Sequence, residues 1–242
     1  MKHYGDSLFM SDVNKQVQYR GISQSQHHLI LISSTSTSSS HTATQNDGQT
    51  RNEPLPPPEL NFTFDESVAE WNVNHREWLK THDKTWDSLA TGALVFDTSN
   101  RILLLQRAPD DSMPNKWEIP GGACDDEDET VLYGCARELW EEAGLRLRHI
   151  RRVIPDGPNG KPGAVFTNRT GKRFFCKFSF EVDVEDTAEV KLDPKEHQDY
   201  VWATEDEAKG QKMGEREIPL TNGLMVRLIE KGFAMRRDDK GR

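Results

Sequence analysis

The segment Gly121–Leu145, GGACDDEDETVLYGCARELWEEAGL, constrains the fold more than any other part of the chain. It predicts a helix that begins at Asp128 or Thr130, runs to Ala143 and is ended by Gly144. At about 100° per residue, one face of this helix is apolar and must pack against a core. That face carries Leu132, Cys135, Ala136, Leu139 and Ala143. The chain must therefore bury one side of a helix whose sequence is otherwise strongly acidic.

The acidic side of the predicted helix consists of Glu138, Glu141 and Glu142, spaced at i, i+3 and i+4. Three converging carboxylates repel one another unless a positive charge lies between them, whereas an ordinary solvated face mixes both signs. Arg137 is adjacent in sequence but points about 100° away from the trio, so we expect it to pair with Glu129 instead. Because clustered carboxylate oxygens suit Mg²⁺ or Mn²⁺, the trio is a candidate cation site.

The loop before this helix adds two glycines and five consecutive acids, Asp125–Glu129. Gly121 and Gly122 carry no side chain, so their backbone can approach an ion or a phosphate closely. We expect Asp125–Asp128 to be solvated loop charge that also raises the local cation concentration.

Composition excludes several classes of function. The 242 residues carry a net charge of -9, and non-specific nucleic-acid binding needs a basic surface, so we expect no stable nucleic-acid complex. No apolar run approaches the roughly 20 residues of a membrane span. Cys124, Cys135 and Cys176 show no CxxC spacing, which favours reduced thiols and a cytoplasmic or nuclear location.

The chain divides into four parts. Residues 1–58 are rich in Ser, Thr and Pro and predict a disordered tail; organelle targeting is less favoured because arginines are few. Residues 59–88 predict a helical extension that begins near Asp65 and packs by an aromatic stripe, rather than a ligand-stacking platform. Residues 89–236 form the main domain, and residues 237–242 form a charged tail. The stripe consists of Val68, Trp71, His75, Trp78, Leu79 and His82.

The main domain alternates predicted strands with helices. GALVFD and RILLLQR, separated by TSN, predict a hairpin, and KWEIPGG predicts a short strand. LRLRHIRRVI and DYVWA predict further strands, and KRFFCKFSFEVDV alternates apolar with polar residues. Thr204 and Glu207 form a capping box that begins a helix, and LTNGLMVRLIEKGFAM predicts the last one. This order predicts an α/β fold, with helices covering a mixed β-sheet.

The acidic segment resembles the box of the Nudix hydrolase family. That box has a glycine, a glutamate and then Arg-Glu-apolar-x-Glu-Glu-x-Gly-apolar, and the intervals match from Glu129 to Leu145. One departure is that six residues separate Gly122 from Glu129, where the family usually has five. The flanking LLLQR, WEIPGG and DPKEHQDYVWATEDEA also match, so the resemblance covers about Ala90 to Ala208. The stretch DSMPNKWEIPGGACDDEDET is most similar to the sequences of Nudix-domain proteins of filamentous fungi. The resemblance implies a Nudix-like α/β/α sandwich around a mixed β-sheet.

The resemblance also implies roles for individual residues. Arg137 and Glu129 would orient the loop and the helix for catalysis, and Arg107 and Gly121 would bind substrate. The cation, Mg²⁺ or Mn²⁺, would be held by Glu138, Glu141, Glu142 and the Gly122 carbonyl.

The implied reaction is hydrolysis of a nucleoside diphosphate linked to another moiety, a small-molecule substrate, by attack of water on phosphorus. A base must take the proton of the water. Glu196 in DPKEHQDYVW is our candidate, and His197, Glu189 and Glu141 are its rivals. Two alternatives are a nucleotide-sensing module without catalysis, disfavoured because all the box glutamates are present, and a prenyl-diphosphate isomerase, which would need a catalytic cysteine such as Cys124.

Overall fold

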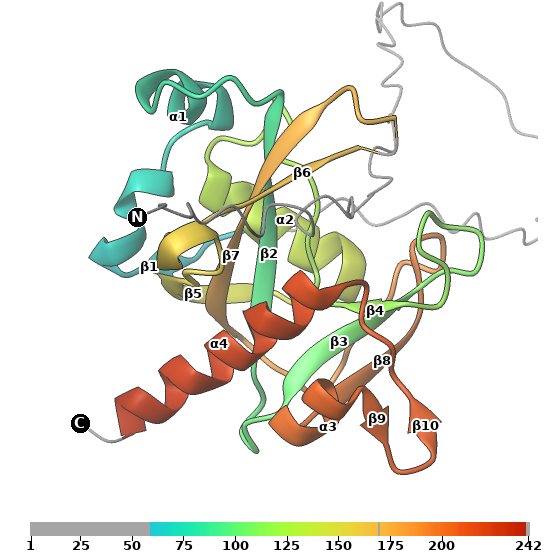
Figure 1. Cartoon of the computed structure of the whole chain (residues 1–242). Helices are drawn as coiled ribbons and strands as arrows, with labels where there is room; N and C mark the ends of the chain where they lie inside the picture. The colour runs from blue at the N-terminus through green and yellow to red at the C-terminus, as the bar shows by residue number, and fades with distance from the viewer. Residues whose placement is uncertain (1–58, 169, 241–242) are drawn as a thin grey trace, which may run out of the picture.

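The computed structural model describes residues 59–168 and 170–240, so the tail expected over residues 1–58 lies outside the described residues. Figure 1 follows the described chain from β1 to α4. The elements are β1 (Thr63–Phe64), the 3₁₀ helix η1 (Glu66–Trp71), α1 (His75–Thr81), β2 (Ser88–Val95), β3 (Ile102–Arg107), β4 (Trp117–Glu118), α2 (Val131–Ala143), β5 (Leu147–Val153), the 3₁₀ helix η2 (Pro158–Gly160), β6 (Ala164–Thr167), β7 (Phe174–Val184), β8 (His197–Ala203), α3 (Glu205–Gly210), β9 (Lys212–Met213), β10 (Arg216–Glu217) and α4 (Gly223–Lys240).

The strands form two principal sheets. The larger sheet has the order β1-β5-β7-β2, with β6 also paired to β7, and the smaller has the order β4-β3-β8. The larger sheet is mixed, because β2 runs parallel to β7 while β5 and β6 run antiparallel to it. The prediction of a mixed sheet is therefore confirmed, and the long alternating strand β7 is its centre.

The prediction of a hairpin from GALVFD and RILLLQR is correct at the turn but wrong for the strands that flank it. The two strands meet only through a bridge between Phe96 and Ile102, and then diverge into different sheets. All eight residues of β2 are buried, so its pairing is decided by the long apolar strand β7, with which it forms eight pairs. A turn in the sequence fixes only local pairing, whereas each partner in β7 is 87 residues away in the chain (Ser88 pairs with Phe175).

The single helix expected after Asp65 is two helices. Chain direction changes at residues 72–74, because Asn74 adopts an extended conformation and its side chain caps α1 by accepting the Arg76 amide hydrogen at 2.9 Å. The stripe does pack on the domain: Trp71 and Trp78 lie 5.4 and 5.0 Å from the ring of Phe178. His82 is exposed and stacks on Trp78 instead of entering the core.

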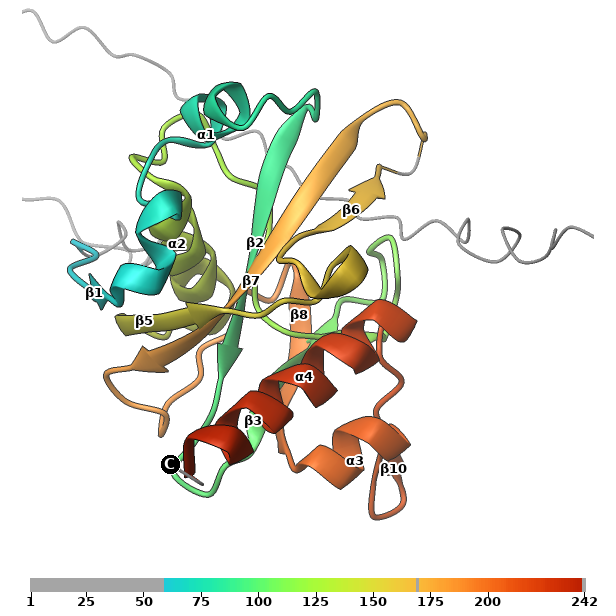
Figure 2. The same ribbon diagram turned by 60° about the vertical axis from the view of Figure 1, so that its left-hand side comes forward.

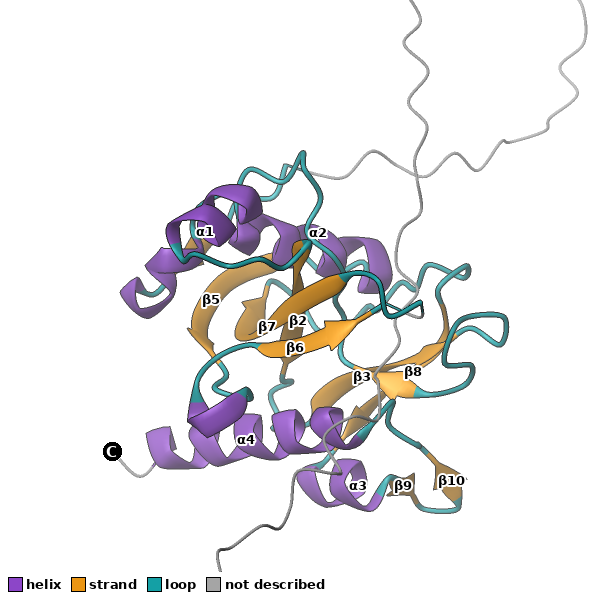
Figure 3. Ribbon diagram, turned by 45° about the horizontal axis from the view of Figure 1, so that its top comes forward, coloured by secondary structure: helices purple, strands orange, loops and turns teal. Residues whose placement is uncertain are grey.

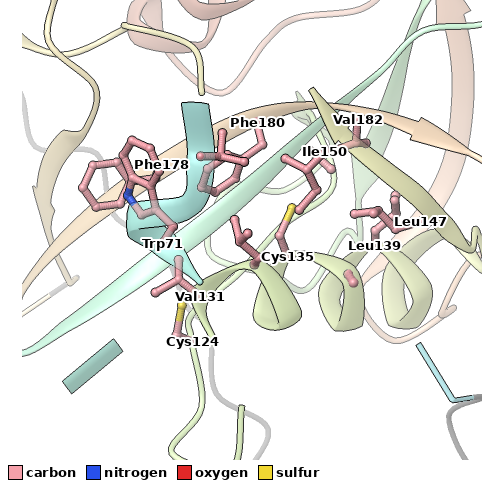
Figure 4. Close-up of a cluster of buried hydrophobic side chains, with 14 of the residues drawn as sticks. Trp71, Cys124, Val131, Cys135, Leu139, Leu147, Ile150, Phe178, Phe180 and Val182 are labelled. Atoms are coloured by element: carbon pink, nitrogen blue, oxygen red, sulfur yellow. The ribbon is translucent and has the colours of Figure 1, made fainter. Parts of the chain in front are cut away.

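Helices cover both faces of the larger sheet, as the α/β/α prediction requires (Figure 3). On one face, α2 and the extension bury a core in which Trp71 lies beside Phe178 and Phe180, and Cys135 of α2 faces Ile150 (Figure 4). On the other face, the smaller sheet and α4 enclose a second core, with α3 next to α4 (Figure 2). The site described next lies at the end of α2, between these layers.

The C-terminal prediction needs one correction. The charged tail expected from residue 237 is not separate, because α4 continues to Lys240. Within the described residues, no helix combines the length and apolarity needed to cross a membrane.

Candidate metal centre and active site

Helix α2 forms at the predicted position, and its two ends are set by local sequence. The Thr130 hydroxyl accepts a hydrogen bond from the Tyr133 amide at 3.0 Å, which caps the helix, and Gly144 ends it with a φ of 66°. The expected apolar face is buried from Leu132 to Ala143. The glutamates consequently lie on the side that faces the loop after β4.

The three glutamates of α2 occupy different environments. Glu142 is only 6% exposed, and its carboxylate accepts the Gly121 amide hydrogen at 2.6 Å. Glu138 has a side chain that is 13% exposed and lies so close to Gly122 that a Cβ there would be 2.6 Å from its Oε2. Glu141 is half exposed. Gly122 is therefore required for the close approach of loop and helix, and its carbonyl accepts the Thr91 amide hydrogen at 2.8 Å.

Burial and mutual repulsion make two of these carboxylates reluctant to ionise. Burial raises the pKa of Glu142, and the nearby Glu118 adds to this effect while His197 opposes it. Burial also raises the pKa of Glu138 well above its usual range, which Glu142 and Glu141 reinforce and Arg137 opposes. Groups of this kind gain most from a cation, which favours the ionised form.

Arg137 does not pair with Glu129, and this expectation is corrected. Its Nε and Nη2 donate to the carboxylate of Asp128 at 2.8 and 2.9 Å. Its Nη1 donates to Glu138 at 2.9 Å and to Glu141 at 2.8 Å, so the long side chain does reach the trio from which it was expected to point away. Arg137 thus joins the loop to two of the glutamates.

Asp128 was expected to be solvated, but it is 3% exposed. Its carboxylate also accepts the Asp125 amide hydrogen at 2.8 Å. Asp128 lies six positions after Gly122, with five residues between them, which is the spacing that the family usually has. The extra residue is therefore accommodated after Asp128, and Glu129 is turned outward beside Thr130 and Tyr133, where it is exposed. Asp125, Asp126 and Glu127 are exposed, as expected.

Glu196 and His197 come to Glu142 from the start of β8. One ligand atom of each of these three residues lies within 4.8 Å of the others. Asp193 forms the turn expected before the strand, since its carbonyl accepts the amide hydrogens of Glu196 and His197 at 3.1 and 2.9 Å. Burial raises the pKa of Glu196, with further contributions from Asp193 and Glu141, while His197 opposes the shift. Glu189, in contrast, is exposed and pairs with Lys191 at 3.3 Å.

A buried ion cluster lies beneath this convergence and was missed by sequence reasoning. Glu118 is 2% exposed and pairs with Arg107, and its Oε1 lies 3.6 Å from Nε2 of His197. Burial opposes the charged form of His197, but Glu118 and Glu142 outweigh it and raise the pKa of its imidazole. The available signal was an acidic residue inside the buried strand KWEIP, opposite a strand ending in arginine.

Two residues predicted to bind substrate have structural partners here. The guanidinium of Arg107 is buried and contacts both Glu118 and Asp111. Gly121 has a φ of 142° and lies so close to Thr91 that a Cβ would be 2.2 Å from the Thr91 carbonyl oxygen, while its amide holds Glu142. Direct contact of Arg107 or Gly121 with a substrate stays a prediction.

The cysteines are free and buried, as expected for reduced thiols. Cys124 is 5% exposed, and burial raises its pKa well above the usual value, with Asp128 reinforcing the shift. A thiol in this environment is protonated near neutral pH and is a poor nucleophile. The site therefore gives no support to an isomerase that uses Cys124.

Comparison with known proteins gives one match over more than half of the chain, the NUDIX domain, over residues 87–222. The chain is 38% identical over 60 residues to a MutT-like protein of Streptomyces ambofaciens, covering 25% of this chain and 36% of that protein. It is 40% identical over 60 residues to an RNA pyrophosphohydrolase of a Psychrobacter species, covering 25% and 32%. It is 46% identical over 57 residues to the human m7GpppN-mRNA hydrolase NUDT17, covering 23% and 17%.

The chain thus spans about a third or less of the length of these relatives. Among solved structures, the MutT protein of Methanosarcina mazei Go1 is 24% identical with a TM-score of 0.46, covering 62% of this chain and 94% of that one. An Ap4A hydrolase of C. elegans is 21% identical with a TM-score of 0.46, covering 62% and 98%. The matched residues 87–222 include the whole site from Arg107 to His197, with α2 and its glutamates at the centre. The chain belongs to the NUDIX domain family.

Proposed function

We propose that this chain is a divalent-cation-dependent pyrophosphohydrolase. It hydrolyses a nucleoside diphosphate linked to another moiety, by attack of water on phosphorus. The new bond forms between the water oxygen and one phosphorus, and the bridging P–O bond breaks, which leaves two monophosphates.

One observation carries the proposal: Glu142, Glu196 and His197 bring ligand atoms within 4.8 Å of one another, although they come from two separate elements of the domain. Helix α2 supplies Glu142, and the start of β8 supplies the other two. Folding has also brought Glu142 close to Glu138, and the pKa of both acids is raised by burial, with Glu142 raising that of Glu138 further by repulsion. Perturbed acids that converge in this way are typical of functional sites.

The donors fit Mg²⁺ or Mn²⁺. The site offers mainly carboxylate oxygens, which both ions prefer, and Glu138 and Glu142 would hold the ion with help from Glu141 and the Gly122 carbonyl. When bound, the ion would neutralise the diphosphate and lower the pKa of water. Arg137 fixes the positions of Glu138 and Glu141 by its hydrogen bonds to both.

Glu196 is the proposed general base. It faces Glu142 but is more exposed, so a water molecule can reach its carboxylate. Its raised pKa makes its carboxylate a better proton acceptor than an ordinary glutamate near neutral pH. His197 is the weaker candidate, since it is 2% exposed and its imidazole lies against Glu118.

The relatives named as an RNA pyrophosphohydrolase and an mRNA-cap hydrolase support a substrate with a nucleotide part. The net charge of -9 supports a small nucleotide derivative over a long nucleic acid. The substrate class is therefore a nucleoside diphosphate derivative.

The experiment is a panel of nucleoside diphosphate derivatives incubated with the enzyme, Mg²⁺ and ¹⁸O-labelled water. We expect cation-dependent cleavage of at least one substrate, with one ¹⁸O atom in a monophosphate product. Binding of nucleotides without turnover of any substrate would favour the sensing module, and a label found outside the phosphate would contradict attack on phosphorus.

A further inference from the structure

The N-terminal extension contacts the acidic loop that precedes α2. Arg76, in α1, donates to both carboxylate oxygens of Asp126 at 2.6 Å, a bidentate pair. The buried side chain of His75 lies alongside, with its Nε2 3.3 Å from Oδ1 of Asp126. Arg76 and His75 lie outside residues 87–222, the part of the chain matched by the NUDIX domain, whereas Asp126 lies inside it.

Asn74 makes a second and different link to the same loop. Its Oδ1 caps α1, while its Nδ2 donates to the main-chain carbonyl of Asp128 at 3.0 Å. One residue earlier, the Val73 carbonyl accepts the amide hydrogen of Val131, the first residue of α2, at 2.9 Å. The extension therefore holds the loop at its middle and at its junction with the helix.

Asp128 connects these contacts to the proposed cation site. Its carbonyl is held by Asn74, and its carboxylate is bound by Arg137, which in turn donates to Glu138 and Glu141. The loop also carries one residue more than is usual in the family, so its conformation is not set by the box sequence alone.

We propose that Asn74 and Arg76 are positioning residues for the cation site: the N-terminal extension fixes the long acidic loop so that Asp128 reaches Arg137 and Glu138 and Glu141 are correctly placed. The extension is thus part of the catalytic unit. This inference rests on the proposed function, because it concerns the affinity of the same cation site.

The size of the effect follows from exposure. The side chains of Arg76 and Asp126 are 65% and 57% exposed, so their pair is a modest interaction. Its loss should weaken cation binding about two- to fivefold. Charge alone predicts the opposite sign, because replacing a cation by an anion near an acidic site should strengthen cation binding.

The test is calorimetric titration of the full-length protein with Mg²⁺ or Mn²⁺ alone, in Arg76→Glu, Asn74→Asp and Lys80→Glu variants. Lys80→Glu is the matched control, because it changes the charge of the same helix by the same amount as Arg76→Glu. Lys80 is exposed, and among the described residues its side chain has no contact to the loop. Asn74→Asp keeps a good N-cap but removes the donor to Asp128. The double variant Arg76→Glu with Asp126→Arg restores the ion pair in reverse.

We expect a higher cation Kd in Arg76→Glu and Asn74→Asp, a Kd equal to or below that of the wild type in Lys80→Glu, and recovery in the double variant. Circular dichroism should show the same helix content in all of them. If the wild type binds the cation and both variants bind it equally well, the positioning role is wrong. If the wild type itself binds no cation, the proposed function fails before this inference is reached.

Discussion

The partner of Arg137 is tested by Asp128→Ala. This change removes a buried carboxylate that accepts hydrogen bonds from Arg137 Nε, from Arg137 Nη2 and from the Asp125 amide, at 2.8, 2.9 and 2.8 Å. Breaking a buried ion pair from one side typically costs about 3–5 kcal/mol. Because Arg137 keeps its bonds to Glu138, Glu141 and the Ala123 carbonyl, we expect the lower end, about 3 kcal/mol.

For a domain of this size, about 3 kcal/mol corresponds to a fall in Tm of roughly 6–12 °C. Thermal unfolding followed by circular dichroism, in the absence of divalent cations, measures it. Glu129→Ala is the matched control, since Glu129 is exposed and its truncation should change stability by less than about 0.5 kcal/mol. A stable Asp128→Ala protein together with a destabilised Glu129→Ala protein would refute the pairing and restore Glu129 as the partner.

Three further predictions follow from burial and charge. Glu138→Gln should abolish cation-dependent turnover while leaving the cation-free protein as stable as the wild type or more so, because it relieves repulsion with Glu142 and Glu141; activity assays and melting curves check both parts. Glu196→Gln should lower the chemical rate by roughly 10²–10⁴-fold, with partial recovery at high pH and unchanged cation affinity; a rate within about threefold of wild type would move the base to Glu141 or His197. Burial raises the pKa of Asp156 to about 6, so the folded state binds this proton more tightly than the unfolded state. The free energy of unfolding should therefore fall by at most about 3 kcal/mol as the pH rises from about 4 to about 6. Asp156→Asn should flatten that fall in urea titrations, and an equally steep fall in the variant would assign it to other groups.

The features that depend on local rules were predictable from the sequence. Helix α2, its Thr130 cap, its Gly144 end and the Thr204–Glu207 capping box depend on residues a few positions apart, and all are confirmed. The convergence of Glu196 with the helix glutamates was suggested by family resemblance, and the structure brings Glu196 close to Glu142.

The remaining features depend on contacts that spacing cannot show. Strand β2 pairs with β7 instead of β3, because long-range burial outweighs the turn between neighbouring strands. Asp128 replaces Glu129 as the partner of Arg137 because the loop accommodates its extra residue after Asp128, whose carbonyl also accepts a hydrogen bond from Asn74, far away in the chain. Glu118 was missed because a charged residue within a buried strand is intelligible only once Arg107 and His197 lie beside it.

The most direct test of the proposed cation site is the rate of substrate hydrolysis as a function of Mg²⁺ concentration, compared between the wild type, Glu142→Gln and the exposed control Glu129→Gln. Glu142 converges with Glu196 and His197, whereas Glu129 is exposed and does not belong to this group. We predict saturating Mg²⁺ dependence in the wild type and in Glu129→Gln, and no Mg²⁺-stimulated rate in Glu142→Gln. Equal Mg²⁺-stimulated rates in the wild type and Glu142→Gln would contradict the assignment of the site.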